Sequence, residues 1–154
     1  MGGTIVHQMS ARSDIEGVVA SGDLDTLQLV REGASVYTLR KGLSDTILYD
    51  EEGVRERYGF GPEHIVDYKS LRGDPSDNIP GVPGIGEKTA SMLINKFENL
   101  DNLFKEIEKE KSAQKSKSII SEKLVQKLLE NKDVAFFSKK LSTIIRDVDI
   151  DFKL

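Results

Sequence analysis

The stretch Gly73-Asp-Pro-Ser-Asp-Asn-Ile-Pro-Gly-Val-Pro-Gly-Ile-Gly86 is the most informative part of this 154-residue chain. Seven of its fourteen residues are Gly or Pro, so it can be neither a regular helix nor a strand. Residues 87–97 follow it with apolar side chains at helical spacing, among them Leu93 and Phe97. Residues 63–72, before it, also have a helical pattern. The stretch is therefore predicted to be a long loop between two helices.

The glycine-rich end of this loop, residues 81–86, has the composition of an anion-binding turn. Glycine lets a backbone approach a ligand closely, and the first N–H groups of the next helix present positive charge to it. The glycine order and the missing Gly-Lys-Ser/Thr exclude a Rossmann fingerprint and a nucleotide P-loop. A hairpin that holds one backbone phosphate, with Lys88 and Lys96 as counter-charges, would bind DNA without reading its sequence. A helix–helix turn without a ligand is the alternative, and the glycines alone favour neither.

Two pairs of carboxylates form a second candidate site. Asp23 and Asp25 follow residues 17–20, a short apolar run predicted to be a buried strand, and open α/β sheets place ligands at such strand ends. Asp74 and Asp77 lie in the loop. Four carboxylates brought together repel one another unless a cation neutralises them, and oxygen ligands without cysteine select Mg²⁺ or Mn²⁺. A single Gly-Asp-x-Asp motif by itself is more typical of a turn capped by an aspartate.

The other segments predict an α/β layer followed by helices. Strands are expected over residues 17–20, 36–39, 46–49 and 143–145, and helices over 3–13, 25–30, 50–58, 63–72, 87–97, 99–107 and 121–140. The turn Arg40-Lys41-Gly42 joins two of the strands in a hairpin, and the lysine-rich stretch 108–118 is expected to be mobile. No internal repeat or linker divides the chain into two separately folding domains.

Composition narrows the class of protein. There are 22 basic and 26 acidic residues, a formal net charge of −4, no cysteine and two histidines. Disulfide frameworks, thiolate nucleophiles and Cys-ligated zinc are thereby excluded, and the absence of cysteine favours a cytoplasmic protein. No apolar run reaches the length of a membrane span.

Charge is unevenly distributed along the chain. Residues 14–78 hold 14 acidic and 7 basic side chains, whereas residues 105–140 hold 10 lysines and 6 acidic side chains. This distribution matters more than the net charge when nucleic acid is considered as a partner. Two solvated helical faces of opposite sign are the more common cause of such a bias.

Several motifs together resemble the 5′-nuclease domain of bacterial DNA polymerase I. They are Ser21-Gly-Asp-Leu-Asp-Thr-Leu-Gln-Leu-Val30, Arg40-Lys-Gly42, Leu48-Tyr-Asp-Glu-Glu52, Val54-Arg-Glu-Arg-Tyr-Gly59 and the run from Gly73 to Ala90. The similarity continues through Ser138-Lys-Lys-Leu-Ser-Thr-Ile144 to Asp151-Phe152 and so covers nearly the whole chain.

The resemblance implies an α/β fold in which a partial parallel, Rossmann-like (PIN-like) sheet precedes a mostly helical region. Residues 1–60 would be the C-terminal part of the nuclease core, residues 61–140 a helix-hairpin-helix DNA-binding region, and residues 141–154 a return to the core. The implied activity is cleavage of DNA 5′ ends and flaps by two-metal hydrolysis.

Site residues are carried over by matching the motifs. Asp23, Asp25, Asp74 and Asp77 correspond to metal-binding aspartates. The hairpin residues that correspond to DNA contacts are Gly81, Gly84, Ile85, Gly86, Lys88 and Thr89. In relatives a potassium ion assists at this hairpin. The basic turn of Arg40 and Lys41 would be a further DNA contact, although solvated surface is the more common role of such a turn.

The chain departs from the family pattern at its start. In relatives the segment like residues 3–6 follows a Glu-x-Asp-Asp cluster, and more metal-binding aspartates lie upstream, so half of the metal site is expected to be missing. An incomplete parallel sheet should also expose apolar strand surface and favour self-association or a second chain. A nuclease that works with an N-terminal segment or polymerase domain is one interpretation. A non-catalytic duplex-DNA-binding module and an inactive relic are the others.

Overall fold

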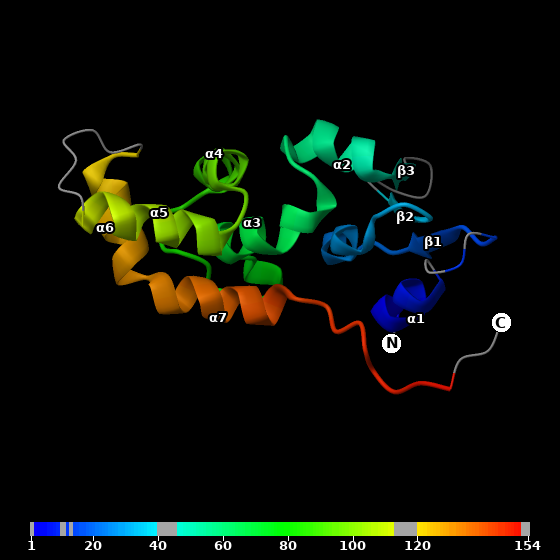
Figure 1. Cartoon of the computed structure of the whole chain (residues 1–154). Helices are drawn as coiled ribbons and strands as arrows, with labels where there is room; N and C mark the ends of the chain where they lie inside the picture. The colour runs from blue at the N-terminus through cyan, green and yellow to red at the C-terminus, as the bar shows by residue number, and fades with distance from the viewer. Residues whose placement is uncertain (1, 10–11, 13, 40–45, 113–119, 152–154) are drawn as a thin grey trace. The chain divides into compact units, whose positions relative to one another are not determined.

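The structure is a computed structural model that describes residues 2–9, 12, 14–39, 46–112 and 120–151 (Figure 1). The chain forms two compact units, one of residues 1–65 with 143–154 and the other of residues 66–142. The predicted basic turn of Arg40 and Lys41 lies outside the described residues.

The first unit contains a three-stranded sheet in the order β1 (Gly17–Ala20), β2 (Ala34–Leu39), β3 (Thr46–Tyr49). The strands expected over 17–20, 36–39 and 46–49 are confirmed. β1 and β2 are parallel, whereas β2 and β3 are antiparallel, which confirms the predicted hairpin, so the sheet that the resemblance implied to be parallel is in fact mixed. The reason is the connection: the six residues 40–45 can join antiparallel neighbours, whereas a parallel crossover needs a dozen or more.

One face of this sheet packs on α1 (Gly2–Met9) and on the returning C-terminal segment. Val6, Leu29 and Ala34 form a buried cluster to which Val19 and Ile144 add. The strand expected over 143–145 is wrong. The backbone N–H of Ile144 donates to the Gln28 side chain at 2.9 Å instead of joining a ladder.

The opposite face of the sheet carries exposed apolar side chains. Val18 is 56% exposed, Leu48 55% and Tyr37 41%. Tyr37 pairs with Ala20 on one side and with Leu48 on the other, so these side chains share a face. The prediction that β1 is a buried strand is therefore wrong at Val18, and the prediction of exposed apolar strand surface is confirmed.

Aspartates cap two short helices of this unit. η1 (Leu24–Leu29) begins after Asp23, whose carboxylate accepts the N–H of Asp25. α2 (Glu51–Tyr58) begins after Asp50, which accepts the N–H of Gly53 at 2.8 Å, and ends at Gly59 in the left-handed region with φ of 82°. η2 (Pro62–His64) then leads out of the unit.

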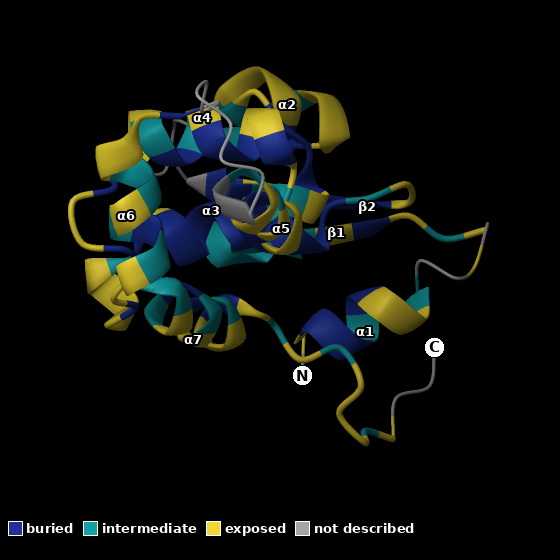
Figure 2. Ribbon diagram, turned by 60° about the vertical axis from the view of Figure 1, so that its left-hand side comes forward, coloured by how far each residue is buried: buried dark blue, intermediate teal, exposed yellow. Residues whose placement is uncertain are grey.

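The second unit is helical. Its elements are α3 (Ile65–Arg72), η3 (Pro75–Asp77), α4 (Glu87–Phe97), α5 (Leu100–Ser112), α6 (Glu122–Glu130) and α7 (Lys132–Ser142). Their apolar stripes form the core, which includes Leu71, Leu93, Leu103, Phe104 and Leu128. Figure 2 shows α4 with a buried side and an exposed side, as its periodicity predicts.

In the second unit, the helices expected over 121–140 and 99–107 have different bounds in the structure. The helix expected over 121–140 is interrupted at Asn131, whose side chain donates to the backbone carbonyl of Lys127 at 2.9 Å. α5 continues to Ser112, so residues 108–112 are helical rather than mobile. An ion pair of 2.7 Å between Lys132 and Glu108 supports this extra turn. No helix among the described residues has the length and hydropathy needed to cross a membrane.

Candidate nucleic-acid and metal site

The loop between α3 and α4 is anchored in the core of the second unit. Ile79, Val82 and Ile85 are each at most 5% exposed. The N–H of Gly81 donates to the buried hydroxyl of Ser138 at 3.1 Å, and that of Val82 donates to the carbonyl of Leu71 at 2.9 Å. The buried side chains of Ile79, Val82 and Ile85 thus fix a loop that lacks regular secondary structure. Its backbone conformation therefore does not depend on a ligand.

On the exposed side of this loop, a set of backbone donors has no acceptor. Among the described residues, nothing accepts a hydrogen bond from the N–H groups of Gly84, Gly86 or residues 87–89, the first turn of α4. Gly86 is the N-cap of that helix and offers no side-chain cap. The N–H groups of Gly81 and Ile85, by contrast, are used inside the protein. Of the predicted DNA-contacting residues, Gly81 and Ile85 therefore have hydrogen-bonded N–H groups. The N–H groups of the others in the loop and in α4 are open to a ligand.

Both carboxylate oxygens of Asp74 accept hydrogen bonds from side chains of the second unit. The Ser76 hydroxyl donates to its Oδ1 at 2.6 Å, and the buried ammonium of Lys69 binds its Oδ2 at 2.9 Å. The Ser76 hydroxyl bond, followed by the hydrogen bond and charge of Lys69, lowers the pKa of Asp74 from 3.8 to about 2. Both carboxylate oxygens are thus engaged by donors of the same unit.

Asp77 differs from Asp74 although it lies in the same loop. It ends η3 and is exposed, and no described residue donates a hydrogen bond to its carboxylate. Its two oxygens are available to a cation.

The aspartates of the first unit lie where β1 ends. Asp23 is exposed, and its Oδ1 accepts the N–H of Asp25 at 2.8 Å, which caps η1. Asp25 is half-buried in the first turn of η1. The position of the pair directly after a strand end is as the sequence predicts. All-oxygen donors of this kind fit a hard divalent cation such as Mg²⁺ or Mn²⁺.

Two lysines near the loop were missed by sequence reasoning. Lys69 is 6% exposed beside Asp74, and Lys127 of α6 reaches Gly84. A lysine in the last turn of a helix, such as Lys69, is ordinarily a solvated dipole partner, so the sequence carries no signal for its burial. Lys127 is one of ten lysines in the basic region, and no pattern in the sequence distinguishes it from the others.

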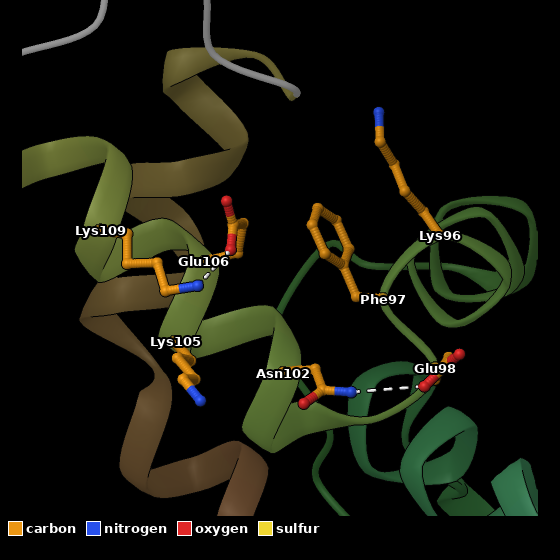
Figure 3. A pocket seen from close by; sticks show the side chains of 7 residues that line it. All are labelled: Lys96, Phe97, Glu98, Asn102, Lys105, Glu106 and Lys109. Carbon is orange, nitrogen blue, oxygen red and sulfur yellow. Dashed lines mark hydrogen bonds and ion pairs between the residues drawn. The ribbon is translucent and has the colours of Figure 1, made fainter. Parts of the chain in front are cut away.

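A cavity of about 410 Å³ lies at the other end of α4 from this loop (Figure 3). Its lining residues are Lys96, Phe97, Glu98, Asn102, Lys105, Glu106 and Lys109. The Asn102 amide donates to Glu98 at 3.4 Å and Lys109 pairs with Glu106 at 3.1 Å, as the dashed lines in Figure 3 mark. Four of the lining side chains are thus engaged with one another.

Comparison with known proteins places residues 60–154 in a family model described as "5′-3′ exonuclease, C-terminal SAM fold". DNA polymerase I of Bacillus subtilis is 44% identical over 143 residues, which cover 92% of this chain and 15% of that protein. The 5′-3′ exonuclease of Buchnera aphidicola is 38% identical over 154 residues, 99% of this chain and 50% of that protein. The chain thus spans half or less of the length of these relatives.

Solved structures share the fold. A T5 5′-exonuclease with bound zinc ions matches with a TM-score of 0.70 at 21% identity, over 90% of this chain and 47% of that one. The catalytic core of Rad2 in complex with a DNA substrate matches with a TM-score of 0.58 at 18% identity, over 94% of this chain and 47% of that one. This chain, an α/β fold with a small mixed sheet and many helices, is therefore similar in fold to both.

Proposed function

Because the chain belongs to the 5′-3′ exonuclease family, we propose that it takes part in metal-dependent hydrolysis of DNA at 5′ ends and flaps. The second unit would hold the duplex, and the aspartates of both units would hold divalent cations. Since the chain spans only part of its relatives, a further nuclease segment or a polymerase domain would work with it in the cytoplasm.

This proposal rests on the N–H groups of Gly84, Gly86 and residues 87–89, from which no described residue accepts a hydrogen bond. A phosphate accepts several N–H bonds at once, and the positive end of the α4 dipole adds to the attraction. Gly84 and Gly86 leave the backbone open to a bulky anion, and Lys88 follows in the first turn of α4. We propose that α3, this loop and α4 act as a helix-hairpin-helix that grips one backbone phosphate of duplex DNA. A potassium ion at the turn is part of the same proposal.

The proposed metal site uses Asp23, Asp25, Asp74 and Asp77. Asp77 is the stronger candidate in the loop because its carboxylate receives no hydrogen bond from the described residues. Asp74 keeps its charge at neutral pH and is oriented by Lys69, so it would bind a cation only by sharing oxygens with that ammonium. When bound, divalent ions activate a water molecule and stabilise the leaving oxygen of a phosphodiester.

A second function is favoured by the placement of the donors. The open N–H groups of the loop and of the first turn of α4 belong to the second unit, so this part of the proposed duplex contact lies within that unit. A chain that binds DNA without cutting it would have these groups and no complete metal cluster. We therefore keep a non-catalytic duplex-DNA-binding module as the alternative.

Cleavage of a 5′-labelled flap substrate separates the two functions. The purified chain is incubated with the substrate in Mg²⁺ or Mn²⁺, with EDTA as control, and the same substrate is used in a gel shift. Metal-dependent cutting supports the nuclease, and salt-dependent binding without cutting supports the binding module. If the chain neither binds nor cuts the substrate, both functions are refuted.

A further inference from the structure

We infer that Lys127 of α6 is a phosphate-binding residue of the 81–86 loop. The inference rests on the proposed function of that loop, to which it adds a charged side chain from a distant part of the sequence. Neither the aspartate motifs nor the hairpin motif includes this residue.

The contact between Lys127 and Gly84 carries the inference. Gly84 is exposed and has φ of 74°, and a β-carbon built on it would collide with the ammonium nitrogen of Lys127 and lie 3.8 Å from its Cε. The ammonium therefore occupies the space that a side chain at position 84 would need. Glycine at this position serves the left-handed backbone and also makes room for this cation.

The charge of Lys127 is not neutralised within the described part of the chain. None of its residues forms an ion pair or a hydrogen bond with the ammonium, although the side chain is half-buried. Glu130, one turn away, accepts a hydrogen bond from Gln126 at 2.8 Å instead. Lys132 of the neighbouring helix, by contrast, pairs with Glu108 at 2.7 Å. An ammonium with no counter-ion among the described residues thus lies at a loop whose backbone donors also lack acceptors in that part of the chain.

This combination favours an anion between the two sets of donors. Positive groups held close together repel one another, and an oxyanion that accepts from both relieves the repulsion. A phosphate of the DNA backbone has several acceptor oxygens, so it can bind the loop N–H groups through one and the ammonium through another. In the competing explanation, Lys127 only lays its aliphatic stem over the glycine and keeps its charge in water.

The salt dependence of duplex binding distinguishes these explanations. Binding of a blunt DNA duplex is measured over a series of NaCl concentrations for the parent chain, Lys127→Gln, Lys127→Arg and Lys109→Gln. Lys109 is the matched control, because its loss removes the same charge from the same unit but its ammonium pairs with Glu106. Thermal unfolding of each variant shows whether the fold is retained.

We expect Lys127→Gln to reduce the slope of log K against log[salt] by about 1, and Lys127→Arg to restore it. Lys109→Gln should keep the parent slope. A folded Lys127→Gln with the parent slope overturns the inference while the loop proposal stands. A parent chain without salt-dependent binding overturns the loop proposal and the inference together.

Discussion

Gly73 and Gly81 pack backbone against backbone at the base of the loop that carries Asp74 and Asp77. A β-carbon on Gly81 would collide with the amide of Gly73 and lie 2.7 Å from the carbonyl carbon of Arg72. Both glycines have positive φ, 77° and 60°. Between them Asp74 and Ile79 exchange two backbone hydrogen bonds of 2.9 Å. The aspartate loop is thus closed on itself, and the phosphate loop begins at the same point.

Gly81→Ala is expected to destabilise the fold by about 2–4 kcal/mol, because it adds a left-handed alanine and a collision with backbone. Urea unfolding measures the change. Gly86→Ala is the matched control, since a β-carbon there meets nothing within 4 Å and φ is −92°. Equal stability of the two variants would mean that the close approach of Gly73 and Gly81 has no energetic role.

Asp74→Asn is expected to lose about 1.5–3 kcal/mol of stability at neutral pH, because Lys69 and Ser76 bind the ionised carboxylate. The folded pKa of about 2 lies below the ordinary 3.8, so the stabilising effect is complete above the ordinary value and is lost as pH falls toward 2.

Urea unfolding in EDTA at successive pH values tests this pH dependence. The difference between the parent chain and Asp74→Asn should be constant above pH 5 and shrink below pH 4, roughly the window set by the two pKa values. Asp77→Asn, which removes a carboxylate without hydrogen-bond partners among the described residues, is the control and should leave stability nearly unchanged. A difference that persists undiminished at pH 2 would contradict the role of Lys69 and Ser76.

Asp23→Asn combined with Asp77→Asn is expected to abolish any cleavage and to spare duplex affinity, since loss of carboxylates near phosphates cannot weaken electrostatic attraction. Flap cleavage and a gel shift measure the two properties side by side. Glu52→Gln combined with Glu122→Gln, which removes two exposed carboxylates elsewhere, controls for the change in charge. Weaker DNA binding by the double variant would argue against the metal assignment.

Val18→Lys combined with Leu48→Lys is expected to reduce self-association, because it places charge on the exposed apolar face of the sheet. Sedimentation velocity over a concentration series measures association. Glu52→Lys changes the net charge equally on the exposed surface of α2 and should have a smaller effect. A chain that is monomeric at every concentration before substitution would show that this face does not mediate contacts between copies.

Local patterns predicted most elements because their causes are local. Helical spacing identified α4, and the caps Asp23 and Asp50 follow from short polar side chains before a helix. The break between α6 and α7 at Asn131 was not predictable, because the apolar stripe continues across it. At the break the Asn131 side chain donates a hydrogen bond to the backbone carbonyl of Lys127, one turn earlier. The return segment at Ile144 was misjudged because its partner, Gln28, is remote in the sequence.

The sequence by itself determined the loop between two helices, the positions of the candidate aspartates and the likeness to a nuclease family, because these depend on residue types at fixed short spacings. Only the tertiary structure decided which members of each motif are available. The N–H groups of Gly81 and Ile85 donate to acceptors inside the protein, whereas no described residue accepts from Gly84, and Lys127 lies beside Gly84. Donors bind the carboxylate of Asp74, but none of the described residues donates to that of Asp77. Hydrogen bonds and charges are satisfied through space, by groups whose proximity no local pattern records.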